Sequence, residues 1–256
     1  MTLLLLPLAL ASDPAFPPVS EVVAGGQIDW THLRLEVSAM SERTVGAWKD
    51  VRLQEQDALD RLAPRMLNLA PLVHLTPDQA VGDLMAGDDD LALRLREGLQ
   101  DWHVDETRYI SSGRVEMDAA LDLQLWLRPA LVAGAKAPPP APLTGTSTGV
   151  LVDVRGLDFK PSLVPTLLSP DGAPVFGLAD LNAETVRRGP PVIYATDPVD
   201  PAVISRVGEA PLLARAQKIG GDGEVLLLDA DAAALRACAD LPSLLAAGKV
   251  VLVVGP

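Results

Sequence analysis

A proline-rich stretch, Ala137–Thr148, divides this chain near its middle. Proline extends the backbone and removes a hydrogen-bond donor, whereas the Gly, Ser and Thr residues that follow loosen the chain. The stretch therefore predicts a linker at 135–148; an SH3-type proline ligand is the alternative, for which one short run is weak support. The 256 residues then divide into a leader and extended N-terminus (1–18), an N-terminal α+β domain (19–134) and a C-terminal β-rich α+β domain (149–256).

The second half opens with the alternation typical of a strand. Val150, Val152 and Val154 share one parity, and Asp153 and Arg155 share the other. Residues two apart in a strand project from the same face, so the aspartate and the arginine are expected to form a structural ion pair. Substrate binding by this pair is the alternative interpretation.

A turn sequence follows the first strand of this half. Ser169–Gly172 places Pro at the second position and Gly172 at the fourth, which predicts a type I turn joining Thr166–Leu168 to Val175–Gly177. The remaining pattern predicts a helix capped by Asn182 and ended by a left-handed Gly189, strands at Val192–Ala195, Leu212–Ile219, Glu224–Leu228 and Val250–Val254, a glycine turn at Gly220–Gly223, and helices at Asp231–Cys238 and Leu241–Ala247.

The first half begins with a strand and continues with helices. Leu33, Leu35, Val37 and Ala39 share one face of a half-buried strand. Ser41 is expected to cap a helix that Pro64 kinks or splits, with an apolar stripe of Trp48, Val51, Ala58, Leu62, Met66 and Leu69. Thr76–Gln79 is expected to open a second helix with a capping box, and Asp88–Asp90 a third with a stripe of Leu91, Leu95 and Leu99.

A hairpin closes this half. Trp102–Ser111 is expected as one strand, Ser112-Gly113 as the turn and Arg114–Arg128 as a long partner strand, with a bulge at Ala119-Ala120. The fold class predicted for the whole chain is α+β, in two small two-layer domains of which the second is β-rich.

Charge and the N-terminus bear on partners and compartment. The formal net charge of −13 would repel phosphate backbones, so no nucleic-acid partner is expected. Leu3–Leu10 followed by Ala11 resembles a signal peptide with a cleavage position after Ala11, although no Lys or Arg precedes Arg34. Export is the preferred interpretation, and a cytoplasmic protein is the alternative if this leader is not functional.

No catalytic motif is recognisable. Gly248-Lys249 lacks the remainder of a phosphate loop, and His32, His74 and His103 are scattered. Asp88–Asp90 is the strongest metal candidate, but its spacing does not match a calcium loop and capping of a helix explains it better. Cys238 is expected as a buried small hydrophobic residue. We therefore expect neither an enzyme nor a bound cofactor or metal.

The chain also resembles a known group of proteins. The residues that carry the resemblance are Thr148-Gly149, Val152–Leu157, Pro165–Gly177, Arg206–Gly208 with Pro211-Leu212, Asp231-Ala232, Lys249–Val254 and, in the first half, Ile28–Trp30. On these turns and strands the chain is similar to bacterial envelope proteins related to flagellar assembly protein T and to the LPP-type outer-membrane lipoproteins. It departs from them in lacking a lipid-anchoring cysteine and a basic leader.

The resemblance implies a structural protein of the periplasm or the outer membrane, associated with flagellar or other motility machinery. We therefore expect a non-enzymatic exported scaffold or assembly protein that contacts other envelope proteins, associates peripherally with the outer membrane and oligomerises. The alternative is a periplasmic module that binds a small ligand or glycan between its domains. The candidate structural or interaction residues are Asp153, Arg155, Gly156, Gly172 and Arg206.

Overall fold

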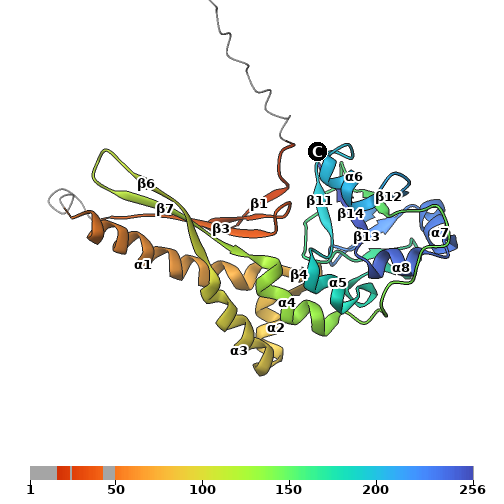
Figure 1. Cartoon of the computed structure of the whole chain (residues 1–256), viewed down its shortest axis with the longest axis horizontal. Coiled ribbons are helices and arrows are strands. Elements are labelled where there is room, and N and C mark those ends of the chain that lie inside the picture. The colour runs from red at the N-terminus through yellow and green to blue at the C-terminus, as the bar shows by residue number, and fades with distance from the viewer. Residues whose placement is uncertain (1–15, 24, 43–49, 256) are drawn as a thin grey trace, which may run out of the picture.

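A computed structural model describes residues 16–23, 25–42 and 50–255. The predicted leader, its cleavage position and Trp48 lie outside these residues. Within them the chain is α+β, as predicted, with a five-stranded antiparallel sheet and a two-stranded hairpin in the first half and a seven-stranded mixed sheet in the second. Figure 1 shows the first-half sheet and α1 reaching away from the second half as an elongated arm.

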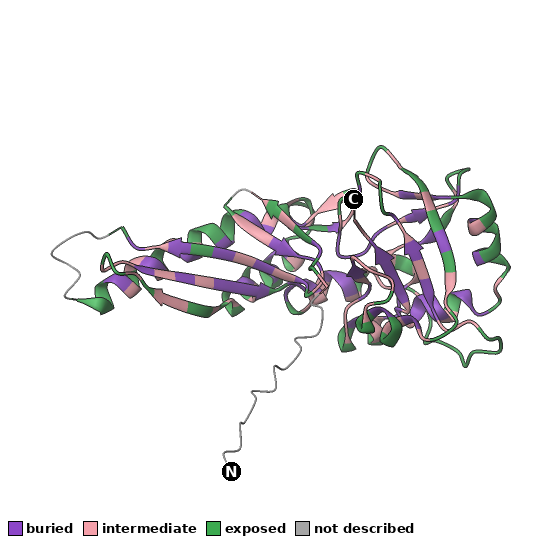
Figure 2. Cartoon of the chain, turned by 90° about the horizontal axis from the view of Figure 1, so that it is seen from above, coloured by how far each residue is buried: buried purple, intermediate pink, exposed green. Residues whose placement is uncertain are grey.

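The first-half sheet has the strand order β1-β2-β3-β7-β6, and every neighbouring pair is antiparallel. Its apolar face packs on α1, because Leu35, Val37 and Ala39 of β3 point toward that helix, as their alternation predicted. Figure 2 shows the resulting alternation of burial along the strands. The strands are β1 (Ser20–Val23), β2 (Gly26–Asp29), β3 (Arg34–Met40), β6 (His103–Tyr109) and β7 (Val115–Asp122).

Helix α1 (Val51–Leu69) differs from the prediction at its start. Its N-cap is Asp50, whose side chain accepts a hydrogen bond from the backbone N–H of Leu53. Ser41 is buried instead between two strands and the helix: its hydroxyl accepts from the Val115 N–H and donates to Gln54. The prediction of a Ser41 cap was therefore wrong, because Ser41 joins the sheet to the helix. The helix continues past Pro64, and Val51, predicted on the apolar stripe, is exposed.

The predicted helix start at Thr76 is a hairpin. Thr76 ends β4 (His74–Thr76), which pairs with β5 (Gln79–Ala80). Gln79, predicted at the third position of the helix, pairs with Thr76 across the hairpin, which is incompatible with a helix there. The N–H groups of Leu163 and Val164 in the second half hold the preceding residues extended by donating to the carbonyls of His74 and Leu75. Helix α2 (Val81–Gly87) follows, and α3 (Asp89–Gly98) is capped by Asp88 as predicted.

The long strand predicted at Arg114–Arg128 was half wrong. The chain leaves β7 at Asp122, whose carboxylate accepts from the Leu125 N–H and caps α4 (Leu123–Gly134). Leu123 and Leu127 are buried, whereas Leu125 is exposed, as in a helix. The irregularity predicted at Ala119-Ala120 lies on the facing strand, between Val104 and Glu106 of β6.

The second-half sheet has the order β10-β9-β13-β12-β8-β14-β11, in which β12, β8, β14 and β11 run parallel. Helices α5, α7 and α8 pack on one face, and α6 packs on the other over β14 and β11. The elements are β8 (Val150–Asp153), β9 (Leu167–Leu168), β10 (Pro174–Phe176), α5 (Ala183–Arg188), β11 (Ile193–Ala195), α6 (Pro201–Val207), β12 (Leu212–Ile219), β13 (Val225–Leu227), α7 (Asp229–Ala237), α8 (Leu241–Ala246) and β14 (Val250–Val253), with short 3-10 turns at Ala70–Leu72, Leu99–Asp101 and Leu178–Asp180.

Most local predictions for this half are confirmed. Gly172 donates its N–H to the Ser169 carbonyl at 2.9 Å and closes the β9–β10 turn, and Asn182 caps α5. Three details differ. Helix α6 was not predicted, Gly189 is extended at φ −168° and not left-handed, and Cys238 is only half-buried.

One apolar core runs through both halves. At the junction, Trp30 packs edge-on against Tyr194, with ring centroids 6.2 Å apart, and the Tyr194 hydroxyl donates to the Ser162 carbonyl at 2.7 Å. Residues 135–149 form no helix or strand, but they are not loose: the Asp240 carboxylate accepts from the Thr144 N–H and hydroxyl and from the Gly145 N–H. The two halves therefore share one core at the Trp30–Tyr194 contact, and residues 144–145 are held on the second half.

Candidate functional site

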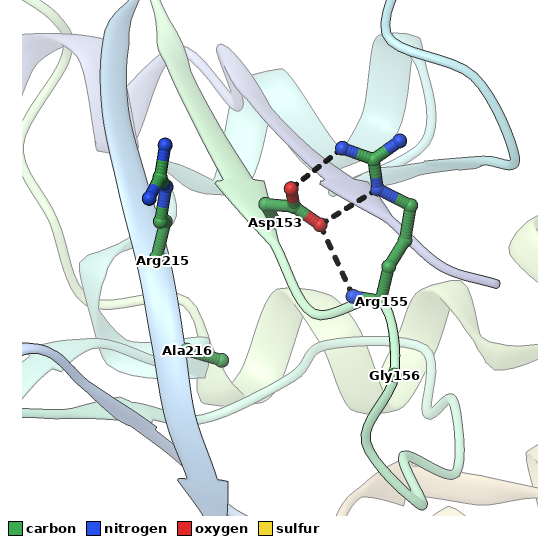
Figure 3. Close-up of a pocket in the computed structure, with 5 residues that line it drawn as sticks. All are labelled: Asp153, Arg155, Gly156, Arg215 and Ala216. Atoms are coloured by element: carbon green, nitrogen blue, oxygen red, sulfur yellow. Dashed lines mark hydrogen bonds and ion pairs between the residues drawn. The ribbon is translucent and has the colours of Figure 1, made fainter. Parts of the chain in front are cut away.

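The predicted pair Asp153 and Arg155 lies where β8 ends, at the carboxyl edge of the parallel strands. Asp153 is in register with Arg215 of β12 on one side and with Val253 of β14 on the other. Together with Gly156 and Ala216, the aspartate and both arginines line a surface depression of about 390 Å³ (Figure 3). In open parallel sheets this edge is where ligands commonly bind.

The ion pair itself is formed. The Asp153 carboxylate accepts from the Arg155 side chain twice, at 2.9 Å from Nε and 2.7 Å from Nη2, and from the Arg155 backbone N–H at 3.1 Å. These hydrogen bonds, above all those from the guanidinium, lower the pKa of Asp153, and the Asp153 carboxylate raises the pKa of Arg155. A bidentate pair of this kind fixes the turn that follows β8.

Arg215 is the member of this cluster that the sequence analysis missed. Its backbone N–H donates to the Asp231 carboxylate at 2.8 Å, while its guanidinium makes no hydrogen bond or ion pair with any described residue. Its positive charge nevertheless contributes to the lowered pKa of Asp153. The signal that could have identified it is the alternation of Leu213, Arg215 and Gln217 on one face of the predicted strand, all three exposed in the structure.

Of the other predicted residues, Gly156 belongs to this cluster and Gly172 and Arg206 do not. Gly156 and Gly172 have φ angles of +76° and +82°, in the left-handed region that favours glycine. Gly172 lies in the β9–β10 turn, at the opposite edge of the sheet from β11. The separation assigns Gly172 a role in the hairpin and not in the depression.

Arg206 ties α6 to the segment before β11. Its guanidinium donates to the carbonyls of Pro190 and Pro191, and burial lowers its pKa. A Cβ added to Gly248 would come within 3.0 Å of the same guanidinium, so this glycine leaves the space that the arginine occupies. Arg206 therefore acts as a packing residue.

The acidic and histidine residues serve local roles. Asp88 accepts from the Leu91 N–H at 3.0 Å as the cap of α3, and His32 and His103 each lie beside a single aspartate, Asp29 and Asp105. Among residues 16–23, 25–42 and 50–255, no group of three or more His, Cys, Asp or Glu side chains is arranged to hold a metal ion. No helix in this part of the chain has the length and apolarity needed to cross a bilayer.

A second cavity, of about 470 Å³, lies between the two halves. The first half contributes Glu21 and His74, and the second half contributes Asp158, Lys160 and the Gly220–Gly223 turn. Asp153 and Arg155 do not line it. The polar anchor that we predicted for a ligand between the domains therefore belongs to a different surface.

Comparison with known protein families gives a similarity in the second half. Residues 149–256, less than half of the chain, match the family model described as the second domain of Treponema pallidum Tp0624. The match begins at the residue where we placed the start of the second half. No curated protein matches the chain. These comparisons provide no link to flagellar assembly protein T or to the LPP-type lipoproteins.

Proposed function

We propose that this protein is a non-enzymatic scaffold or assembly protein of a bacterial envelope, exported to the periplasm and associated peripherally with the outer membrane. The observation that carries the proposal is the shared core at the junction, where Trp30 and Tyr194 fix the first-half arm to the second-half sheet. A scaffold must hold its contact surfaces at a constant separation, and an apolar core shared by both halves favours this.

Three further observations support the same function. The leader-like Leu3–Leu10 favours export. The second half is similar to a domain of a Treponema protein, which is consistent with a bacterial source. A net charge of −13 favours other proteins over nucleic acids as partners. A specific link to motility machinery has only the resemblance behind it and is not part of the proposal.

Fractionation of cells that produce the full chain with a C-terminal tag tests this function. We expect a chain shortened at its N-terminus in the periplasmic or outer-membrane fraction. A photo-crosslinking residue at Tyr109, which is 63% exposed at the edge of the arm, should capture envelope proteins. An intact, unprocessed chain in the cytoplasmic fraction would overturn the proposal.

The cavity at the junction favours a second candidate, a module that binds a small polar ligand or glycan. Pockets between domains are common ligand sites, and this one offers carboxylate, ammonium and imidazole groups from both halves. Equilibrium titration with peptidoglycan fragments tests it. Binding should be lost in the double variant Asp158→Ala/Lys160→Ala and kept in Asp153→Ala/Arg155→Ala; binding that is lost only in the second variant, or no binding at all, contradicts this candidate.

A further inference from the structure

One face of the second-half sheet carries a row of apolar side chains. Ile193, Val251, Leu151 and Leu213 stand in register on the neighbouring strands β11, β14, β8 and β12. Helix α6 covers the β11 and β14 end of the row through Val203 and Val207. At the other end Leu151 is only partly buried, and Leu213 is 68% exposed.

Parallel strands are rarely left uncovered, since their crossover helices usually pack on both faces. On this face, α6 packs on β14 and β11, and α7 packs on β12 from the opposite face. The strip without full cover spans β12 and the partly buried β8, about 10 Å at the usual strand spacing, which matches the diameter of one α-helix with its side chains. Its dimensions therefore suit a helix lying beside α6.

The charges at one end of the strip indicate the chemistry of that helix. Arg215 follows Leu213 on the same face of β12. Two carboxylates beside it already accept other hydrogen bonds: Asp153 accepts from the Arg155 side chain, and Asp231 accepts from the Arg215 backbone N–H. Asp197 acts on Arg155 from the β11 side. The Arg215 guanidinium, with its N–H donors free of described acceptors, is thus complementary to a carboxylate on whatever covers Leu213.

We propose that a partner protein docks an amphipathic helix on β8 and β12, with apolar side chains on Leu151 and Leu213 and a glutamate or aspartate on Arg215. This inference rests on the proposed scaffold function and names the kind of partner segment that the second half holds. In this arrangement the partner helix lies on the sheet beside α6 and presents its apolar face, as amphipathic helices do when they bind a protein surface.

Site-specific photo-crosslinking in cells tests the docking surface. The full chain carries the photo-reactive residue at Leu213, and a matched control carries it at Val22, which is 84% exposed on β1. We expect Leu213 to crosslink to a segment of another protein that mass spectrometry maps to a helix with an apolar stripe and a carboxylate. The control should not yield this segment.

A charge exchange then tests the contact with Arg215. In the Leu213 crosslinking chain, Arg215→Glu should lower the yield of that segment about 10-fold, and replacement of the partner carboxylate by Lys should restore it. Gln217→Glu is the matched control, since Gln217 is exposed on the same strand but lies farther from Leu213. Both variants should unfold at the temperature of the parent chain, because both side chains are exposed.

Crosslinking at Leu213 tests the helix-docking surface, and crosslinking at Tyr109 tests the scaffold function separately. A crosslink from Leu213 to a second copy of this chain or to residues 1–15, no crosslink at all, or a yield unchanged by Arg215→Glu overturns the helix-docking proposal. If Tyr109 still captures envelope proteins in that case, the scaffold function stands and only the assigned surface is wrong. If neither Leu213 nor Tyr109 crosslinks to an envelope protein and the unprocessed chain is found in the cytoplasm, both proposals are contradicted.

Discussion

The two sheets of this protein each leave one face without full cover, and they differ in what that face carries. In the first half the uncovered face of β3, β6 and β7 carries ion pairs: Arg108 contacts Glu106, Glu116 and Asp118 at 2.5–3.0 Å, and Arg34 contacts Asp105. In the second half the corresponding face carries the Asp153–Arg155 pair at its carboxyl edge, but also an exposed leucine, Leu213, and the Arg215 guanidinium, which has no described acceptor.

This difference indicates which face is adapted to water. An antiparallel sheet with one covered face normally alternates apolar and polar residues, and the first-half sheet follows this rule. The second-half sheet is parallel at its centre, and its exposed strand β12 carries a leucine beside its charged residue. Exposure of a face is therefore not by itself evidence of a binding surface; its chemistry distinguishes the two.

The junction tests whether the two sheets form one folding unit, and it should give the largest effect. Trp30→Ala removes a side chain that is 1% exposed and contacts Tyr194, so we expect a loss of about 3–5 kcal/mol in the free energy of unfolding. Urea denaturation followed by hydrogen exchange should show both sheets losing protection together. Loss of protection in the first half alone would mean that the sheets unfold independently.

A matched pair of leucines tests the comparison of the faces directly. Leu35 is fully buried between the first-half sheet and α1, whereas Leu213 is exposed on the second. Leu35→Ala should destabilise the isolated chain by about 2–5 kcal/mol, and Leu213→Ala should change its stability by less than about 0.5 kcal/mol. Chemical denaturation of the two variants measures this; a large loss in Leu213→Ala would show that this face supports the fold rather than a partner.

The hairpin turns at the sheet edges allow a smaller test. Gly113 of the first sheet and Gly172 of the second both adopt positive φ angles, +81° and +82°. A Cβ at Gly172 would meet no atom within 4 Å, so Gly172→Ala should cost only the left-handed conformation, about 1 kcal/mol. Gly189→Ala is the control, since Gly189 has an extended backbone and a Cβ there would also meet no atom within 4 Å. The unfolding temperature of Gly189→Ala should equal that of the parent chain.

The smallest effect concerns pH. Hydrogen bonds from Arg155 lower the pKa of Asp153, so this carboxylate stabilises the folded chain above its unfolded pKa, about 4, and the contribution is lost as the pH falls through the lower folded value. NMR titration should show the Asp153 pKa rising in Arg155→Met and rising less in Arg215→Met. An Asp153 pKa that does not move in Arg155→Met contradicts the assigned pair.

Interactions between residues close in the chain could be predicted from the sequence, whereas contacts between distant residues could not. The caps at Asp88 and Asn182 and the turn at Gly172 were predictable, because their stabilising hydrogen bonds join residues two to four apart. The leucine run after Leu121 fits a strand and a helix equally well. Tertiary packing selects the helix: from the helical segment, the Trp126 indole N–H donates to the Leu95 carbonyl of α3 at a distance of 2.8 Å.

The sequence by itself determined the α+β class, the alternation of the strands and the Asp153–Arg155 pair, because each depends on neighbours along the chain. Only the tertiary structure decided that His74–Thr76 is extended, through backbone bonds to Leu163 and Val164, and that Arg215 stands beside Asp153. It alone decided that Leu213 is exposed beside α6, because strand order and helix placement depend on contacts between distant residues.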